Sequence, residues 1–232
     1  LGDVYKRQHK YSGVFMKRKI AFTLAEVLVT LGIIGVVSAM TVPSLMQNYQ
    51  RQSYVTQLHK VYNELSQILV RYQNDKNALN LFEAGLNSTA AIQNMLTSYT
   101  KVIATCDTVV EPCFANSYKY QSGSTVTAGS YTANIKAYVL ASGAAIRPIY
   151  SATTSKLANF MVDINGPKGP NIVGRDLFFL YLYKNGLIDD GIDSTTNVAP
   201  LTKEQREALG NCTSSVTGCF GRILNDNWEM NY

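Results

Sequence analysis

The stretch that decides the fold is residues 20–46, which read IAFTLAEVLVTLGIIGVVSAMTVPSLM. The 25 residues from Phe22 to Met46 contain a single charged side chain, that of Glu26. A helix needs about 20 apolar residues to cross a bilayer. A secretory signal peptide has a shorter apolar core, followed by a small-residue cleavage site. The stretch therefore predicts a membrane-spanning helix over residues 22–46 rather than a signal peptide.

The apolar stretch continues without a break into an amphipathic segment, residues 47–75. Polar side chains fill most positions there, and apolar side chains recur at spacings of three and four. The recurring residues are Tyr54, Leu58, Val61, Tyr62, Leu65, Ile68, Leu69 and Tyr72. This period is that of a helix with one apolar face. We therefore expect one long helix, whose first half suits lipid or neighbouring helices and whose second half packs on a globular head.

The head, residues 76–232, contains the signals of a small mixed domain. Strand-like runs are found at 135–141, 145–150, 160–164 and 177–183. Gly143 is placed to turn the first two runs into a hairpin. Short helices are expected over 88–101 and 202–210, where capping residues precede helix-forming sequence. The fold class that we predict is α+β, with the long N-terminal helix packed on a head that contains an antiparallel sheet.

The net charge of +5 has an uneven distribution along the chain. Residues 1–21 contain six Lys or Arg and one Asp, whereas the chain from Phe22 onward contains 15 basic and 15 acidic residues. The excess positive charge therefore precedes the apolar stretch, where it holds that end of the helix in the cytoplasm. The neutral remainder offers no general attraction to nucleic acid or to an anionic surface.

The beginning of the chain is expected to be a non-native extension, residues 1–15. Leu1 is not a start residue, and LGDVYKRQ reads like translated sequencing-adapter sequence. Met16 is the natural start, and three basic residues, 17–19, follow it directly. We therefore interpret residues 16–21 as a basic leader and leave the first fifteen out of the fold prediction.

The four cysteines are Cys106, Cys113, Cys212 and Cys219. Neither sequence-local pair has the Cys-x-x-Cys spacing of a zinc or redox site. An even number of cysteines after a membrane-delivery segment suggests disulfides in an oxidising compartment. Of the three possible pairings we favour Cys106–Cys113 and Cys212–Cys219, because each closes a short loop. The alternative is that all four are reduced core cysteines.

The segment KRKIAFTLAEVLVTLGIIG, residues 17–35, resembles the N-terminal methylation motif of type IV pilins and type II secretion pseudopilins. In that family a prepilin peptidase cuts before the phenylalanine and methylates the new amine. The resemblance implies a cut between Ala21 and Phe22. It places the family's glutamate at Glu26 and its helix-kinking proline at Pro43. The chain departs from the family at Ala21, where glycine is usual.

The resemblance also implies a role and a location. It implies a structural subunit rather than an enzyme, cut by prepilin peptidase and held by one span in the bacterial inner membrane. The N-terminus would be cytoplasmic and the head periplasmic, and other pilin or pseudopilin subunits would join it on a secretion or pilus assembly platform. The stretch DINGPKGPNIVGRD, residues 163–176, and the Trp-containing tail look like heads of uncharacterised bacterial pilin-like proteins.

Glu26 has a physical reason to matter, because a carboxylate in a membrane helix is costly without a partner. The free amine of Phe22 on a neighbouring subunit is a suitable partner, and the pair would fix the axial register between subunits. The alternative is that Glu26 lies at the level of the lipid headgroups. Gly32 and Gly35 leave small surfaces for close helix approach, or merely ease the helix into the bilayer.

Two other functions stay open from the sequence. A DNA-uptake pilin of a competence system would share the N-terminus and present a basic patch on its head, which the neutral charge does not encourage. A binding or enzymatic domain on an uncleaved anchor is the other. Enzyme chemistry has little support, because His59 is the one histidine after residue 15 and we expect it to be solvated. That leaves no Ser-His-Asp arrangement and no histidine-rich metal site.

No cofactor is expected, with calcium as the alternative. Asp163, Asn165 and Asp176 offer oxygen ligands of the kind that calcium prefers, and some pseudopilin heads are calcium-stabilised. Their spacing matches no EF-hand, however, and Asp, Asn, Gly and Pro together usually form turns. Asp189-Asp190 and Asp193 form a second acidic loop with the same two interpretations.

Overall fold

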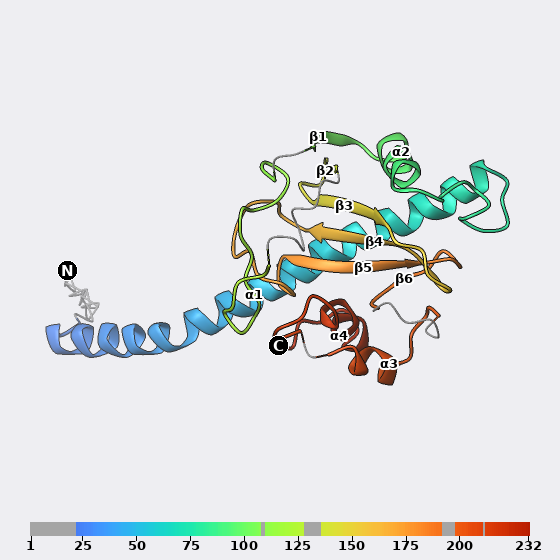
Figure 1. The fold of residues 1–232 in the computed structure, drawn as a ribbon. Helices are drawn as coiled ribbons and strands as arrows, with labels where there is room; N and C mark the ends of the chain where they lie inside the picture. The colour runs from blue at the N-terminus through green and yellow to red at the C-terminus, as the bar shows by residue number, and fades with distance from the viewer. Residues whose placement is uncertain (1–21, 108–109, 128–135, 192–197, 211) are drawn as a thin grey trace, which may run out of the picture. The chain divides into compact units, whose positions relative to one another are not determined.

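The computed structural model describes residues 22–107, 110–127, 136–191, 198–210 and 212–232 (Figure 1). The chain divides into two compact units, the first ending at Met46 and the second comprising Gln47–Tyr232. The predicted leader, residues 16–21, and the extension before it lie outside the described residues. Each unit is described by itself.

The long helix predicted from the apolar pattern is confirmed. α1 (Leu24–Asp75) is a single helix of 52 residues, and Pro43 lies inside it. In the second unit its apolar stripe faces the core, and seven of its side chains are buried: Val55, Leu58, Val61, Leu65, Ile68, Leu69 and Tyr72. Tyr54 and Tyr62, also predicted for this stripe, are partly buried and pack against the same core.

The second unit contains a six-stranded antiparallel sheet, and the predicted α+β class is confirmed. The strands lie side by side in chain order, so that each pairs with the next one along the chain. They are β1 (Val102–Cys106), β2 (Ala137–Leu140), β3 (Ala145–Tyr150), β4 (Lys156–Asp163), β5 (Leu177–Tyr183) and β6 (Ile188–Asp189). The part of α1 that belongs to this unit runs along the sheet in Figure 1.

Two glycines make tight turns of this sheet, and the turn at Gly143 was predicted. Gly143 has a φ of 89° between β2 and β3, and its N–H donates to the carbonyl of Leu140 at 2.9 Å. Gly186 has a φ of 85° between β5 and β6, and its N–H donates to the carbonyl of Tyr183 at 3.0 Å. Residues with a side chain rarely adopt this left-handed backbone, which glycine adopts without a steric cost. Turn chemistry therefore fixes these two strand connections locally.

Three short helices complete the second unit. α2 (Thr89–Tyr99) begins at Ser88, whose hydroxyl accepts the N–H of Ala91 at 3.2 Å. α3 (Lys203–Ala208) begins with a capping box formed by Thr202 and Gln205. Both helices were expected from such caps, although α2 ends two residues before the predicted Lys101. α4 (Cys219–Asn225) was not predicted, because Gly218 precedes it and makes no side-chain cap.

The strand predictions were correct for β2, β3 and β5 and incomplete elsewhere. β4 begins at Lys156 rather than at residue 160, and Lys156 itself is almost completely buried. A charged first residue made this part of the strand resemble a loop. β1 was missed because the apolar side chain of Ile103 is 60% exposed, so that the sequence of this strand does not alternate between apolar and polar residues. β6 has only two residues, too few for a periodic signal.

Candidate assembly site

The assembly segment, residues 22–46, has its apolar side chains exposed on every side. Phe22 and Leu24 are each 78% exposed, and no residue in the most apolar stretch of α1 is buried. Among the described residues, α1 is the one helix long and apolar enough to cross a membrane. Burying one large apolar side chain contributes roughly 1.5–3 kcal/mol. The segment is therefore stable only where lipid or other protein covers it.

Glu26 belongs to a capping box at the first turn of α1. The backbone N–H of Thr23 donates to Glu26 Oε2 at 2.9 Å, and the N–H of Glu26 donates to Thr23 Oγ1 at 3.2 Å. The Thr23 hydroxyl also donates to Oε2, at 3.0 Å. Such a box satisfies N–H groups that the first turn of a helix leaves without partners. This box was not predicted from the sequence, although Thr-x-x-Glu is its usual pattern.

The capping box leaves Glu26 with capacity for a second partner. The hydrogen bonds that its side chain makes within the described residues both go to Oε2. No ion pair among the described residues involves Glu26. A carboxylate accepts several hydrogen bonds, so Oε1 can still accept one from a cation. Phe22, at the predicted cut, lies outside the helix, whereas Ala21 lies outside the described residues.

Pro43 lies inside α1 without ending it. Proline has no N–H, so the carbonyl four residues earlier, at Ala39, loses its helical partner. Near this point the Thr41 hydroxyl donates to the carbonyl of Val37 at 3.0 Å. Gly32 and Gly35 have nothing within 4 Å of the position that a Cβ would occupy. The chain's own fold therefore does not require glycine at these two positions.

The C-terminal tail is held on the amphipathic part of α1 by aromatic contacts. Trp228 stacks on His59 with ring centroids 4.0 Å apart. Its ring also lies 5.1 Å from that of Tyr62 and 5.9 Å from that of Phe220. The expectation that His59 is solvated is wrong, because the ring is partly buried against the indole. Sequence spacing could not show this, since the tail lies far from α1 along the chain.

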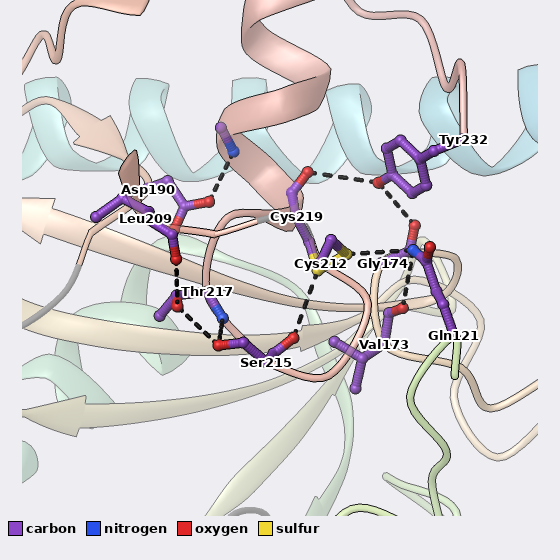
Figure 2. The surroundings of a disulfide bond; sticks show 11 residues. Gln121, Val173, Gly174, Asp190, Leu209, Cys212, Ser215, Thr217, Cys219 and Tyr232 are labelled. Atoms are coloured by element: carbon purple, nitrogen blue, oxygen red, sulfur yellow. Dashed lines mark hydrogen bonds between the residues drawn. A yellow bond between two sulfur atoms is a disulfide. The ribbon is translucent and has the colours of Figure 1, made fainter. Parts of the chain in front are cut away.

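Both cysteine pairs are disulfide-bonded as favoured from the sequence, Cys106–Cys113 and Cys212–Cys219. Figure 2 shows the second bond among the loops that hold the tail. Gln121 Nε2 lies 3.2 Å from Cys212 Sγ. A side chain at Gly174 would collide with the same sulfur, and the Tyr232 hydroxyl donates to the carbonyl of Gly174 at 2.9 Å. The disulfide thus anchors the C-terminal region to the loops on either side of it.

The two carboxylates among the predicted calcium ligands are already engaged in hydrogen bonds, whereas Oδ1 of Asn165 is buried without a partner among the described residues. Asp163 accepts the Tyr118 hydroxyl at Oδ2 and the N–H of Asn165 at Oδ1. Asp176 accepts the N–H groups of Asn171 and Ile172. Within the described ranges no three His, Cys, Asp or Glu side chains gather as metal ligands would. Calcium therefore stays a sequence prediction, and the observed role of these carboxylates is to satisfy loop N–H groups.

The second acidic loop holds helices onto the sheet. Arg206 contacts Asp189 with two nitrogens, Nε at 2.8 Å and Nη2 at 2.7 Å, and joins α3 to β6. Asp190 directly follows β6, accepts the N–H of Gly221 at 2.7 Å and so joins α4 to the end of that strand. Burial raises the pKa of Asp190 to about 6. Asp193, the third predicted acid of this loop, lies outside the described residues.

Comparison with known proteins addresses the N-terminal segment alone. Residues 16–42 match the model of the prokaryotic N-terminal methylation motif. Neither a curated protein nor a solved structure matches the chain. The motif supports a prepilin-peptidase substrate of the type IV pilin and pseudopilin type. A long apolar N-terminal helix and an antiparallel sheet in the C-terminal part are the pilin-like arrangement that this motif leads one to expect.

Proposed function

We propose that this protein is a structural subunit of a type IV pilus-like or type II secretion pseudopilus filament. It is inserted in the inner membrane with a cytoplasmic leader and a periplasmic head, cut by prepilin peptidase between Ala21 and Phe22, and assembled through residues 22–46. The observation that carries the proposal is the coincidence of the matched motif with a helix whose apolar surface is exposed on every side.

The exposed helix suits both places that we propose for the subunit, the membrane and the filament. In the membrane, lipid covers residues 22–46. In the filament, equivalent segments of other subunits replace the lipid, and the head contacts further partners. Between lipid and a bundle of helices the difference in apolar burial is small, so packing and polar contacts decide association. Gly32 and Gly35 supply the small surfaces for close packing.

Glu26 supplies the polar contact. Pairing with the amine of Phe22 on a neighbouring subunit neutralises two charges that are costly in a water-free bundle. The capping box holds the Glu26 side chain at the helix start through Oε2, with Oε1 left to accept from that amine. A pair at one defined height along the helix sets the register of each subunit against the next.

Two substitutions separate the charge of Glu26 from its capping role. Glu26→Gln removes the charge and keeps a side chain that can complete the capping box. Thr23→Ala removes the capping hydroxyl and keeps the charge. We expect Glu26→Gln to abolish sheared filaments while the protein accumulates in the membrane, and Thr23→Ala to assemble at a level close to wild type. Filaments of normal yield from Glu26→Gln would refute the pairing role of Glu26.

A further inference from the structure

Arg147, on β3, is a cation buried inside the sheet of the second unit. It is 4% exposed, because β3 is an inner strand of the six-stranded sheet and both of its faces are covered at this position. Nε and Nη1 are both buried and have no hydrogen-bond partner among the described residues. Arginine keeps its proton under all ordinary conditions, so burial cannot neutralise it as it can a lysine. A guanidinium with two buried nitrogens that lack partners is strongly unfavourable.

The face of the sheet around Arg147 can be assigned from strand pairing. Arg147 lies opposite Met161, and its neighbours on the same face are Ala145, opposite Asp163, and Ile149, opposite Asn159. The ring of Phe114 lies over the guanidinium, with its centroid 5.1 Å from Cζ. The chain between β1 and β2 therefore covers this face at Arg147.

No carboxylate in the described part of the chain compensates Arg147. Asp163 shares its face, but its oxygens accept from the Tyr118 hydroxyl and from the N–H of Asn165. None of the ion pairs among the described residues involves Arg147. The Phe114 ring attracts the cation, but a ring face offsets only part of the cost of removing a charge from water. The Asn159 Oδ1 on the same face is also buried without a partner, and an amide can turn over to present its NH₂ group.

We propose that Arg147 is the centre of a binding site for one small inorganic anion of chloride size, which lies between β3 and the Phe114 loop. A water molecule would supply hydrogen bonds to Nε and Nη1 but no countercharge. A carboxylate side chain of a partner protein is too large to reach two donor atoms that are sealed from solvent. A small anion supplies the charge and accepts from both nitrogens, and its binding couples the sheet to the loop above it.

The test is the response of the full-length protein, in detergent micelles, to chloride at constant ionic strength. Sodium chloride replaces sodium gluconate, whose anion is too large for the site. Anion binding to the folded state raises its melting temperature with a single-site saturation curve, by about 5–11 °C at a hundredfold excess over Kd for a domain of this size. Excess broadening of the ³⁵Cl resonance by the folded protein measures the same binding independently.

Two variants locate the site. Arg147→Met removes the charge at similar volume, and we expect the saturable rise in melting temperature and the ³⁵Cl broadening to disappear. Arg175→Met, at an exposed arginine of the same unit, should keep both. A wild-type protein without a saturable chloride response overturns the proposal, and so does a folded Arg147→Met protein with the wild-type response. If Arg147→Met does not fold, the wild-type protein is compared with Arg175→Met and with urea-unfolded protein. A saturable chloride response in the two folded proteins alone supports the site, and its absence from the wild-type protein overturns the proposal.

Discussion

Trp228 allows a quantitative test of how the C-terminal tail is held on α1. Its backbone is in the left-handed region, with a φ of 63°, and that of Asn227 is there too, with a φ of 53°. A bulky residue in this conformation is strained by about 1–2 kcal/mol. The three ring contacts, with His59, Tyr62 and Phe220, must therefore exceed this strain.

The magnitude follows from those contacts. A fully buried tryptophan costs about 3–5 kcal/mol when it is replaced by alanine. Trp228 is only partly buried, so we expect Trp228→Ala to lower the free energy of unfolding of the second unit by about 2–3 kcal/mol. Trp228→Gly removes the same ring but relieves the left-handed backbone, which costs alanine about 1 kcal/mol. Trp228→Gly should therefore be more stable than Trp228→Ala by that amount, although glycine is the smaller residue.

The assay is urea unfolding of the full-length protein in detergent, followed by far-UV circular dichroism. Trp228 is the only tryptophan of the chain, so wild-type fluorescence reports on the tail directly and should show the same transition midpoint. A loss below about 0.5 kcal/mol for Trp228→Ala, the range of an ordinary surface change, would refute the aromatic contacts as the anchor. A Trp228→Gly protein less stable than Trp228→Ala would refute the backbone argument.

Three further predictions concern the head and the assembly segment. Burial raises the pKa of Asp163 to about 8, so the folded chain holds a proton that the unfolded chain loses near pH 4. The free energy of unfolding should therefore fall by about 1.4 kcal/mol per pH unit as the pH rises from about 6 to 8. Asp163→Asn should flatten this slope in urea titrations at different pH values. Replacing Cys212 and Cys219 by serine should lower the free energy of unfolding by about 2.5 kcal/mol through loop entropy, and an unchanged urea midpoint would contradict the anchoring role of this disulfide. Gly35→Leu should leave the melting temperature of the head unchanged, because nothing lies within 4 Å of its Cβ position, but should lower the filament yield; a normal yield would show that close helix packing does not involve Gly35.

The long helix could be predicted because its signals are local and periodic. Twenty-five residues with one charge, followed by an apolar stripe with helical spacing, have no other simple interpretation. The hairpin at Gly143 and the cap at Thr202 also depend on a few adjacent residues. Each of these features is determined within one or two turns of chain, and the structure agrees with the prediction for each.

The missed features depend on contacts between distant segments. His59 looked solvated because its partner, Trp228, is brought to it only by the fold. Arg147 is a charged residue inside the predicted strand 145–150, and its burial becomes evident only when the Phe114 loop covers that face. α4 has no capping side chain that the sequence could reveal. The neighbouring disulfide and the contact between Gly221 and Asp190 fix its start and position instead.

The proposed function requires that residues 22–46 form an assembly helix that is cut and methylated at Phe22. Intact-mass measurement on protein purified from a host with prepilin peptidase tests it most directly. We expect the mass of the chain that begins at Phe22, with two disulfides and one added methyl group, which fragmentation places on the amine of Phe22. A mature protein that retains Ala21 and the basic residues before it would contradict the claim and indicate a plain membrane anchor.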